Sequence, residues 1–212
     1  MVRKWIGYIG VGSLMCAALG CGILYTRQAR LQQTISDKVL RFHVLANSDS
    51  EADQNLKLAV RDAVGSFMQE KLTAVENLEE CELVVRQSLG EIEEAAAETI
   101  AENGYDYDVT AELEHTSFPV KNYGSYTFPA GDYEALRIVI GEGNGHNWWC
   151  VMYPNMCFSD SMYEVIDEEA GEKLRKVLTT EEYEKVLAEG GYQVRMKYFS
   201  WLNPYLDKLA EN

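Results

Sequence analysis

A run of 21 residues without a charged side chain, WIGYIGVGSLMCAALGCGILY, occupies positions 5–25 near the start of the chain. About 20 apolar residues in an α-helix span the hydrocarbon core of a bilayer. The segment is therefore predicted to be a helix that enters a membrane, so a globular fold has to be built from the residues after it. Arg3 and Lys4 precede the segment, which favours a cytoplasmic amino terminus and export of the remainder.

Two fates are open for this hydrophobic segment. Its length fits an uncleaved anchor, whereas the small residues around Ala18, Gly20 and Cys21 fit a signal-peptidase site. Residues 1–30 are therefore interpreted as a signal peptide or signal anchor, and residues 31–212 as one exported domain behind a short tether, TRQARLQQTISDK. The chain would touch a membrane through this segment if it is not cleaved.

The charge of the remaining residues excludes one class of partner. The first 30 residues contain four basic and no acidic side chains, which leaves 15 basic against 34 acidic residues and a net charge of −19 in the remainder. Such a domain is repelled by nucleic acid phosphates and by anionic lipid head groups. We therefore expect no nucleic acid partner, and we expect the partner surface to have basic character.

Two long amphipathic helices are predicted from apolar residues three and four positions apart. The first follows a capping box from Ser48 to Glu51. The second begins after Asn77 and ends at Asn103-Gly104, and Cys81 lies on its apolar stripe. Helical residues also follow position 167, with a break near Thr179.

Strands are predicted around residues 39–46, 105–115, 135–140 and 148–153, and again from Tyr192 onward. The third and fourth of these are expected to pair as an antiparallel hairpin across the glycine-rich loop GEGNGH. A phosphate cradle needs a helix after the glycines, and a strand follows here, so no cofactor is expected. The fold class is α+β, a mainly antiparallel sheet packed with several helices, behind one N-terminal hydrophobic helix.

Cys150 and Cys157 are candidates for a disulfide. An exported domain meets an oxidising compartment, and a turn at residues 152–155 would place the two cysteines opposite each other. Two reduced, buried thiols are the alternative. A zinc site of His146, Cys150 and Cys157 is a further possibility, but the spacing matches no paired Cys-x2-Cys knuckle, so no metal is expected.

A catalytic role for Cys150 would require a histidine base beside it. His43, His115 and His146 are available in the chain, but the sequence places none of them next to the thiol. Trp148 and Trp149 are consecutive in a strand and therefore point to opposite faces. With Asn147 they form the candidate partner-binding residues, although burial of both rings is equally compatible with the pattern.

Two segments, RFHVLANSDSEADQNLKLAVRDAV from Arg41 and FPAGDYEALRIVIGEGNGHNWWCVMYPNMCF from Phe128, resemble the stage II sporulation protein R family of endospore-forming bacteria. The residues that match the two motifs are His43, Ala46, Asn47, Ser48, Asp49 and Asp53 in the first, and Asn147, Trp148, Trp149, Cys150, Pro154 and Cys157 in the second. After about Asp160 the resemblance is weak.

The resemblance implies a sporulation signal and no catalytic residues. Such a protein is made in the forespore and exported into the space between forespore and mother cell. There it triggers a membrane-embedded protease of the mother cell to process an inactive sigma-factor precursor. The alternatives from other classes are an exported cysteine-dependent hydrolase of peptide or cell-wall material, with Cys150 as nucleophile, and a cell-wall binding module that stacks tryptophan on sugars.

Overall fold

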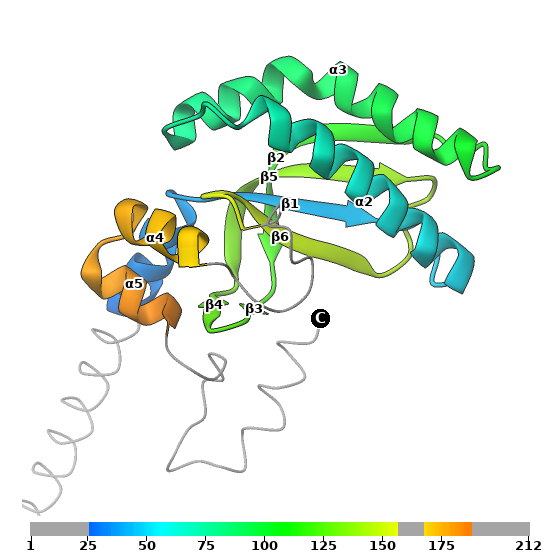
Figure 1. The fold of residues 1–212 in the computed structure, drawn as a ribbon. Coiled ribbons are helices and arrows are strands. Elements are labelled where there is room, and N and C mark those ends of the chain that lie inside the picture. Colours follow the sequence, from blue (N-terminus) through cyan, green and yellow to red (C-terminus); the bar gives the residue numbers. More distant parts are fainter. Residues whose placement is uncertain (1–25, 157–167, 188–212) are drawn as a thin grey trace, which may run out of the picture.

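The structure is a computed structural model and describes residues 26–156 and 168–187 (Figure 1). Residues 26–36 are helical and lead into β1 (Leu40–Leu45). The elements that follow are α2 (Glu51–Lys71), α3 (Leu78–Glu102), β2 (Val109–Phe118), β3 (Lys121–Tyr123), β4 (Tyr126–Phe128), β5 (Gly131–Ile140), β6 (Asn147–Tyr153), α4 (Glu168–Val177) and α5 (Thr180–Leu187). The α+β class is confirmed.

The main sheet is mixed, with the strand order β2-β5-β1-β6. β2 pairs antiparallel with β5, β1 pairs antiparallel with β6, and β1 pairs parallel with β5. The predicted hairpin between residues 135–140 and 148–153 is therefore wrong, because β1 lies between these two strands. β1 carries the sequence LRFHVL and is buried along most of its length, so it requires a neighbouring strand on each side.

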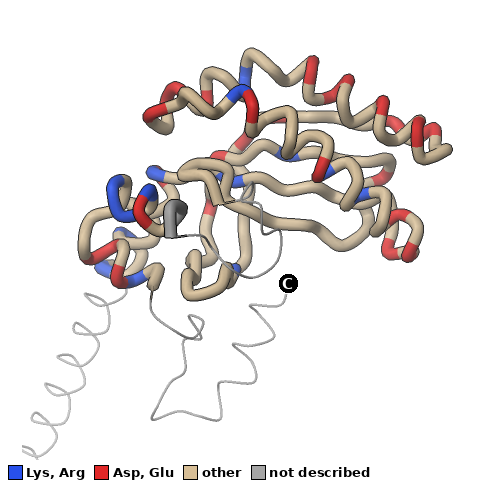
Figure 2. Tube along the Cα trace, in the orientation of Figure 1, with Lys and Arg blue, Asp and Glu red and all other residues tan. Residues whose placement is uncertain are grey.

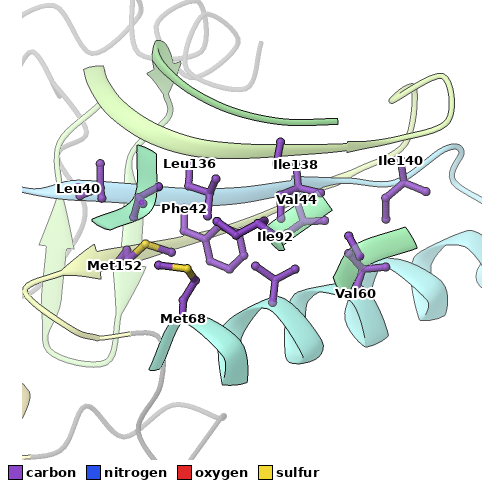
Figure 3. Packing of buried hydrophobic residues seen from close by; sticks show 14 of the residues in the cluster. Leu40, Phe42, Val44, Val60, Met68, Ile92, Leu136, Ile138, Ile140 and Met152 are labelled. Carbon is purple, nitrogen blue, oxygen red and sulfur yellow. The ribbon is translucent and has the colours of Figure 1, made fainter. Parts of the chain in front are cut away.

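α2 and α3 cover one face of the sheet, and their contact with it forms the larger core (Figure 1). Figure 3 shows Phe42 and Val44 of β1 facing Val60 and Met68 of α2 and Ile92 of α3. These five side chains are inaccessible to solvent. Burying one large apolar side chain contributes about 1.5–3 kcal/mol, so this layer is the main source of stability.

A second, smaller core lies on the opposite face of the sheet. Ile35 of the helical residues 26–36 and Leu174 of α4 are fully buried there, together with Val151 of β6 and Phe128 of β4. The predicted tether is thus helical and packed, because Ile35 contributes to this core. β3 and β4 form a separate two-stranded sheet on the same side.

The helix boundaries follow local hydrogen bonds. Ser50, and not Ser48, is the N-cap of α2, with its side chain accepting a hydrogen bond from the backbone of Asp53 at 3.1 Å. The predicted capping box from Ser48 to Glu51 is wrong, because Ser48 lies before the N-cap and its Oγ donates to the Asp53 carboxylate. Asn77 caps α3 as predicted, and Thr179 separates α4 from α5.

Acidic residues recur along α3 (Figure 2), whose sequence contains eight glutamates. Within residues 26–156 and 168–187 there is no helix long and apolar enough to cross a bilayer. The hydrophobic segment 5–25 and the strand expected from Tyr192 lie outside the described residues.

Candidate functional site

The two motifs meet at one end of the main sheet, where the loop after β1 contacts the loop between β5 and β6. The backbone N–H of Gly145 donates to the carbonyl of Ala46 at 2.9 Å, and the N–H of Asn144 donates to the carbonyl of Asn47 at 3.2 Å. Asn47 Oδ1 accepts a further bond from the N–H of Glu142 at 3.0 Å. We call residues 46–53 with residues 141–147 the loop junction.

Asp53 anchors the first loop of the junction from the start of α2. Its carboxylate accepts hydrogen bonds from Ser48 Oγ at 2.5 Å, Asn47 Nδ2 at 2.9 Å and the hydroxyl of Tyr107 at 3.2 Å. The hydrogen bond from Ser48, followed by that from Asn47, lowers the pKa of Asp53. The residue is only 4% exposed, so its charge is satisfied inside the loop junction and is not presented to solvent.

The second loop is held by hydrogen bonds between His146 and Asp49 on the surface. His146 Nδ1 lies 2.5 Å from Asp49 Oδ1, and the N–H of His146 donates to the same oxygen. The hydrogen bond from the His146 side chain is the main cause of the lowered pKa of Asp49. Lys57 donates to the carbonyl of His146 at 3.0 Å, so α2 also supports the loop.

Glycine is required at position 145 because of a close backbone approach. A Cβ atom there would lie 2.2 Å from the carbonyl oxygen of Ser48, far inside contact distance. Gly143 has φ +62°, a left-handed conformation that glycine adopts without a steric penalty. The loop donors from Glu142 to His146 are bonded to protein acceptors, so the loop serves to hold the two motifs together.

Trp148 and Trp149 lie on opposite faces of the sheet, and both are half-buried. Trp148 packs edge-on against Phe42 at 5.4 Å between centroids, with the guanidinium of Arg61 5.1 Å from its ring. Trp149 stacks on His43 at 4.8 Å with an interplanar angle of 11°. The two rings therefore do not form one aromatic patch, and a single flat contact can use only one of them.

Arg41 and His43 are buried on the same face of the sheet as Trp149. Arg41 is 0% exposed, and its guanidinium carbon lies 4.4 Å from the ring centroid of Phe118 and 4.9 Å from that of Tyr133. Sequence reasoning selected His43 but missed Arg41. The available signal was a charged residue two positions from His43 in a strand that is otherwise apolar.

The residues that form these contacts lie within a segment that matches a known protein family. The family model described as stage II sporulation protein R matches residues 36–163, which include β1 to β6 and both loops of the junction. The chain belongs to the stage II sporulation protein R family. A stage II sporulation protein R of Bacillus subtilis (strain 168) is 39% identical over 156 residues, covering 73% of this chain and 70% of that protein. No solved structure matches the chain.

The family-motif cysteine Cys150 is 3% exposed and participates in a disulfide. Its proposed partner Cys157 lies outside the described residues, so their pairing stays a prediction. The backbone N–H of Met156 donates to the carbonyl of Val151 at 3.1 Å, across the turn expected at residues 152–155. Pro154, another motif residue, follows a cis peptide bond in this turn.

The three histidines are distributed over separate sites. Cys150 is paired with Phe42 in the sheet register, so Cys150 and His43 point to opposite faces. His115 lies 3.0 Å from Glu134, and His146 is bonded to Asp49. Among the described residues no group of three His, Cys, Asp or Glu side chains could hold a metal ion. The geometry of this family member gives Cys150 no histidine base in the described part of the chain.

Proposed function

We propose that the chain is exported from the forespore and activates a membrane-embedded protease of the mother cell, which then processes a sigma-factor precursor. Membership of the stage II sporulation protein R family is the observation that carries a sporulation role. The uncharged segment 5–25 behind Arg3 and Lys4 supports export. The activating role is what the family resemblance implies.

In this proposal the folded domain acts as a ligand. It binds the extracytoplasmic part of the protease and shifts it toward an active assembly, for example by favouring a dimer. A ligand shifts such an equilibrium only by binding the active state more tightly than the inactive one. The glutamates along α3 favour a partner surface of basic character, and electrostatic attraction would accelerate the encounter (Figure 2).

The candidate contact surface comprises Asn147 to Trp149, where the loop junction continues into β6. Trp148 belongs to the core beneath α2, so Trp148→Ala is expected to act mainly by lowering stability. Trp149 lies on the other face, and Trp149→Ala is expected to reduce signalling about tenfold or more while the domain still folds, as for an interface hot spot. Full signalling by a folded variant with both substitutions would contradict this surface.

Co-expression in a host that does not sporulate tests the function. The protease and the sigma-factor precursor are produced with the full chain, with a version lacking residues 1–30, and alone, and precursor cleavage is scored by immunoblot. Cleavage is expected only with the exported full chain. If a folded, exported chain produces no cleavage, the proposal is wrong.

A further inference from the structure

The strongest candidate for a further ligand site in this fold is a fully buried arginine that has no carboxylate partner among the described residues. Arg41 Nε donates to the carbonyl of Cys150 at 3.0 Å, and Nη2 donates to the hydroxyl of Tyr123 at 2.9 Å. Nη1 is buried and has no hydrogen-bond partner. A buried guanidinium is normally paired with an acid, because removing its charge from water is costly. Within the described residues no carboxylate forms an ion pair with Arg41, although the chain has 34 acidic residues.

His43 adds two unsatisfied atoms on the same face. It is 2% exposed, and neither ring nitrogen has a hydrogen-bond partner. Burial, with the nearby charges of Arg137 and Arg41, lowers the pKa of His43 to about 3, so the ring is neutral at pH 7 and carries one N–H. Buried polar groups in folded proteins are nearly always paired. Arg41 and His43 therefore present unused donors at alternate positions of one strand.

Lys121 extends the positive charge to the edge of this cluster. Its ammonium lies 5.6 Å from the ring of Trp149, which stacks on His43, and burial followed by the charge of Arg41 lowers the pKa of Lys121. Arg137 differs, because Glu112 and Glu114 lie 3.7 and 3.3 Å from it. The uncompensated charges of the cluster are thus Arg41 and Lys121.

We propose that this face of the sheet binds a carboxylate of an acidic peptide segment, with Arg41 and His43 as the buried donors and Lys121 at the rim. A planar carboxylate matches the fork of a guanidinium, which can donate two parallel hydrogen bonds to it. This inference is independent of the proposed function, since it concerns the ligand of the site and not the protease.

The hydroxyl of Tyr123, on β3, is the group that a ligand would replace. Tyr123 of β3 supplies the neutral oxygen that Arg41 Nη2 now contacts, and Lys121 lies on the same strand. β3 and β4 are three residues long each and pair only with one another among the described strands. A two-stranded sheet of this size is marginally stable by itself, so replacing the Tyr123 contact of Arg41 is a smaller change than opening the main sheet.

The test uses the purified full chain at pH 7 and two blocked peptides, acetyl-Gly-Glu-Gly-amide and acetyl-Gly-Gln-Gly-amide. Binding is followed by NMR through the Arg41 Nε–Hε and His43 ring signals. The glutamate peptide is expected to shift both sets of signals to saturation and to be displaced by acetate, while the glutamine peptide has no effect. Equal responses to the two peptides, no response to either, or displacement of the peptide by phosphate but not by acetate would overturn the proposal.

Two variants and one control separate binding from folding. Arg41→Met has a similar length without the charge and should weaken glutamate-peptide binding at least tenfold, read from the His43 signals. Lys121→Gln, at a half-exposed position, should weaken it severalfold and keeps the test valid if Arg41→Met does not fold. Arg86→Met removes an exposed arginine paired with Glu134 and should leave binding unchanged. Unaltered affinity in both Arg41→Met and Lys121→Gln contradicts the assignment.

Discussion

Asn47 joins the two motifs of this protein. Its side-chain oxygen accepts from the N–H of Glu142, its side-chain nitrogen donates to Asp53, and its carbonyl accepts from the N–H of Asn144. The motif resemblance selected Asn47 and Asp53, but their roles could not be predicted because Glu142 lies 95 positions away in the chain. The spacing of residues along the sequence predicts contacts within one helix or strand. The hydrogen bond between Asn47 and Glu142 depends instead on the order of the strands in the sheet.

Gly145→Ala tests the close contact in the loop junction. The added Cβ would meet the backbone oxygen of Ser48, which cannot move without distorting the start of α2, so the unfolding free energy should fall by about 1–3 kcal/mol. Gly90→Ala in α3 is the matched control, since its Cβ would meet nothing within 4 Å and should add about 0.5–1 kcal/mol. Urea unfolding measures both, and equal stability of the two variants would contradict the contact.

Asp53→Asn tests the anchor of the first loop. An amide cannot accept all the hydrogen bonds that the carboxylate receives, so at pH 7 we expect a loss of about 1–3 kcal/mol. Asp106→Asn, at an exposed position, should change the unfolding free energy by less than about 0.5 kcal/mol.

The pH dependence of the same variant has a defined sign. The pKa of Asp53 is lower in the folded chain than in the unfolded chain, where an aspartate has a pKa of about 3.9. Its contribution to stability is therefore complete above that value and is lost as the pH falls through the lower, folded-state pKa. Urea unfolding between pH 7 and pH 2 should show a shallower acid loss in Asp53→Asn than in the unmodified chain. Parallel curves would show that Asp53 is not the anchor.

The pairing of whole elements was predicted less well than the elements themselves. Both long helices were predicted from periodicity, because one face of each is apolar and buried. The strands predicted at 105–115 and 135–140 exist, but they span 109–118 and 131–140 in the structure. The insertion of β1 between β5 and β6 was missed, because the short loop from Gly141 to His146 suggested a hairpin. This loop has the length of a hairpin connection, but the backbone N–H groups of Glu142, Asn144 and Gly145 donate to acceptors in the loop after β1.

Cys81 reports on the packing of α3 against the sheet. It is 1% exposed, and burial raises the pKa of its thiol to about 12, so little thiolate forms at pH 8. Alkylation of Cys81 by iodoacetamide, followed by mass spectrometry of its peptide, should be negligible in the native chain and should rise with urea along the global unfolding curve. Rapid labelling without denaturant would show that α3 is not packed as described.

At the scale of the whole molecule, the two faces of the sheet differ in character. Glutamates recur on α3 over one face (Figure 2). The buried guanidinium of Arg41 and its aromatic neighbours lie on the other face. The sequence predicted the acidic character from net charge alone, but it could not predict the buried cation, because charge counting does not locate side chains. Family membership connects the chain with sporulation.

The central claim is that the chain activates the protease directly. The most direct test is to add the purified full chain to proteoliposomes that contain only the protease and the sigma-factor precursor. The rate of precursor cleavage should rise with the concentration of chain on the extracytoplasmic side and then saturate, as expected for a ligand that stabilises the active protease. A cleavage rate that stays at its basal value, with the chain verified as folded by its urea unfolding curve, would contradict direct activation.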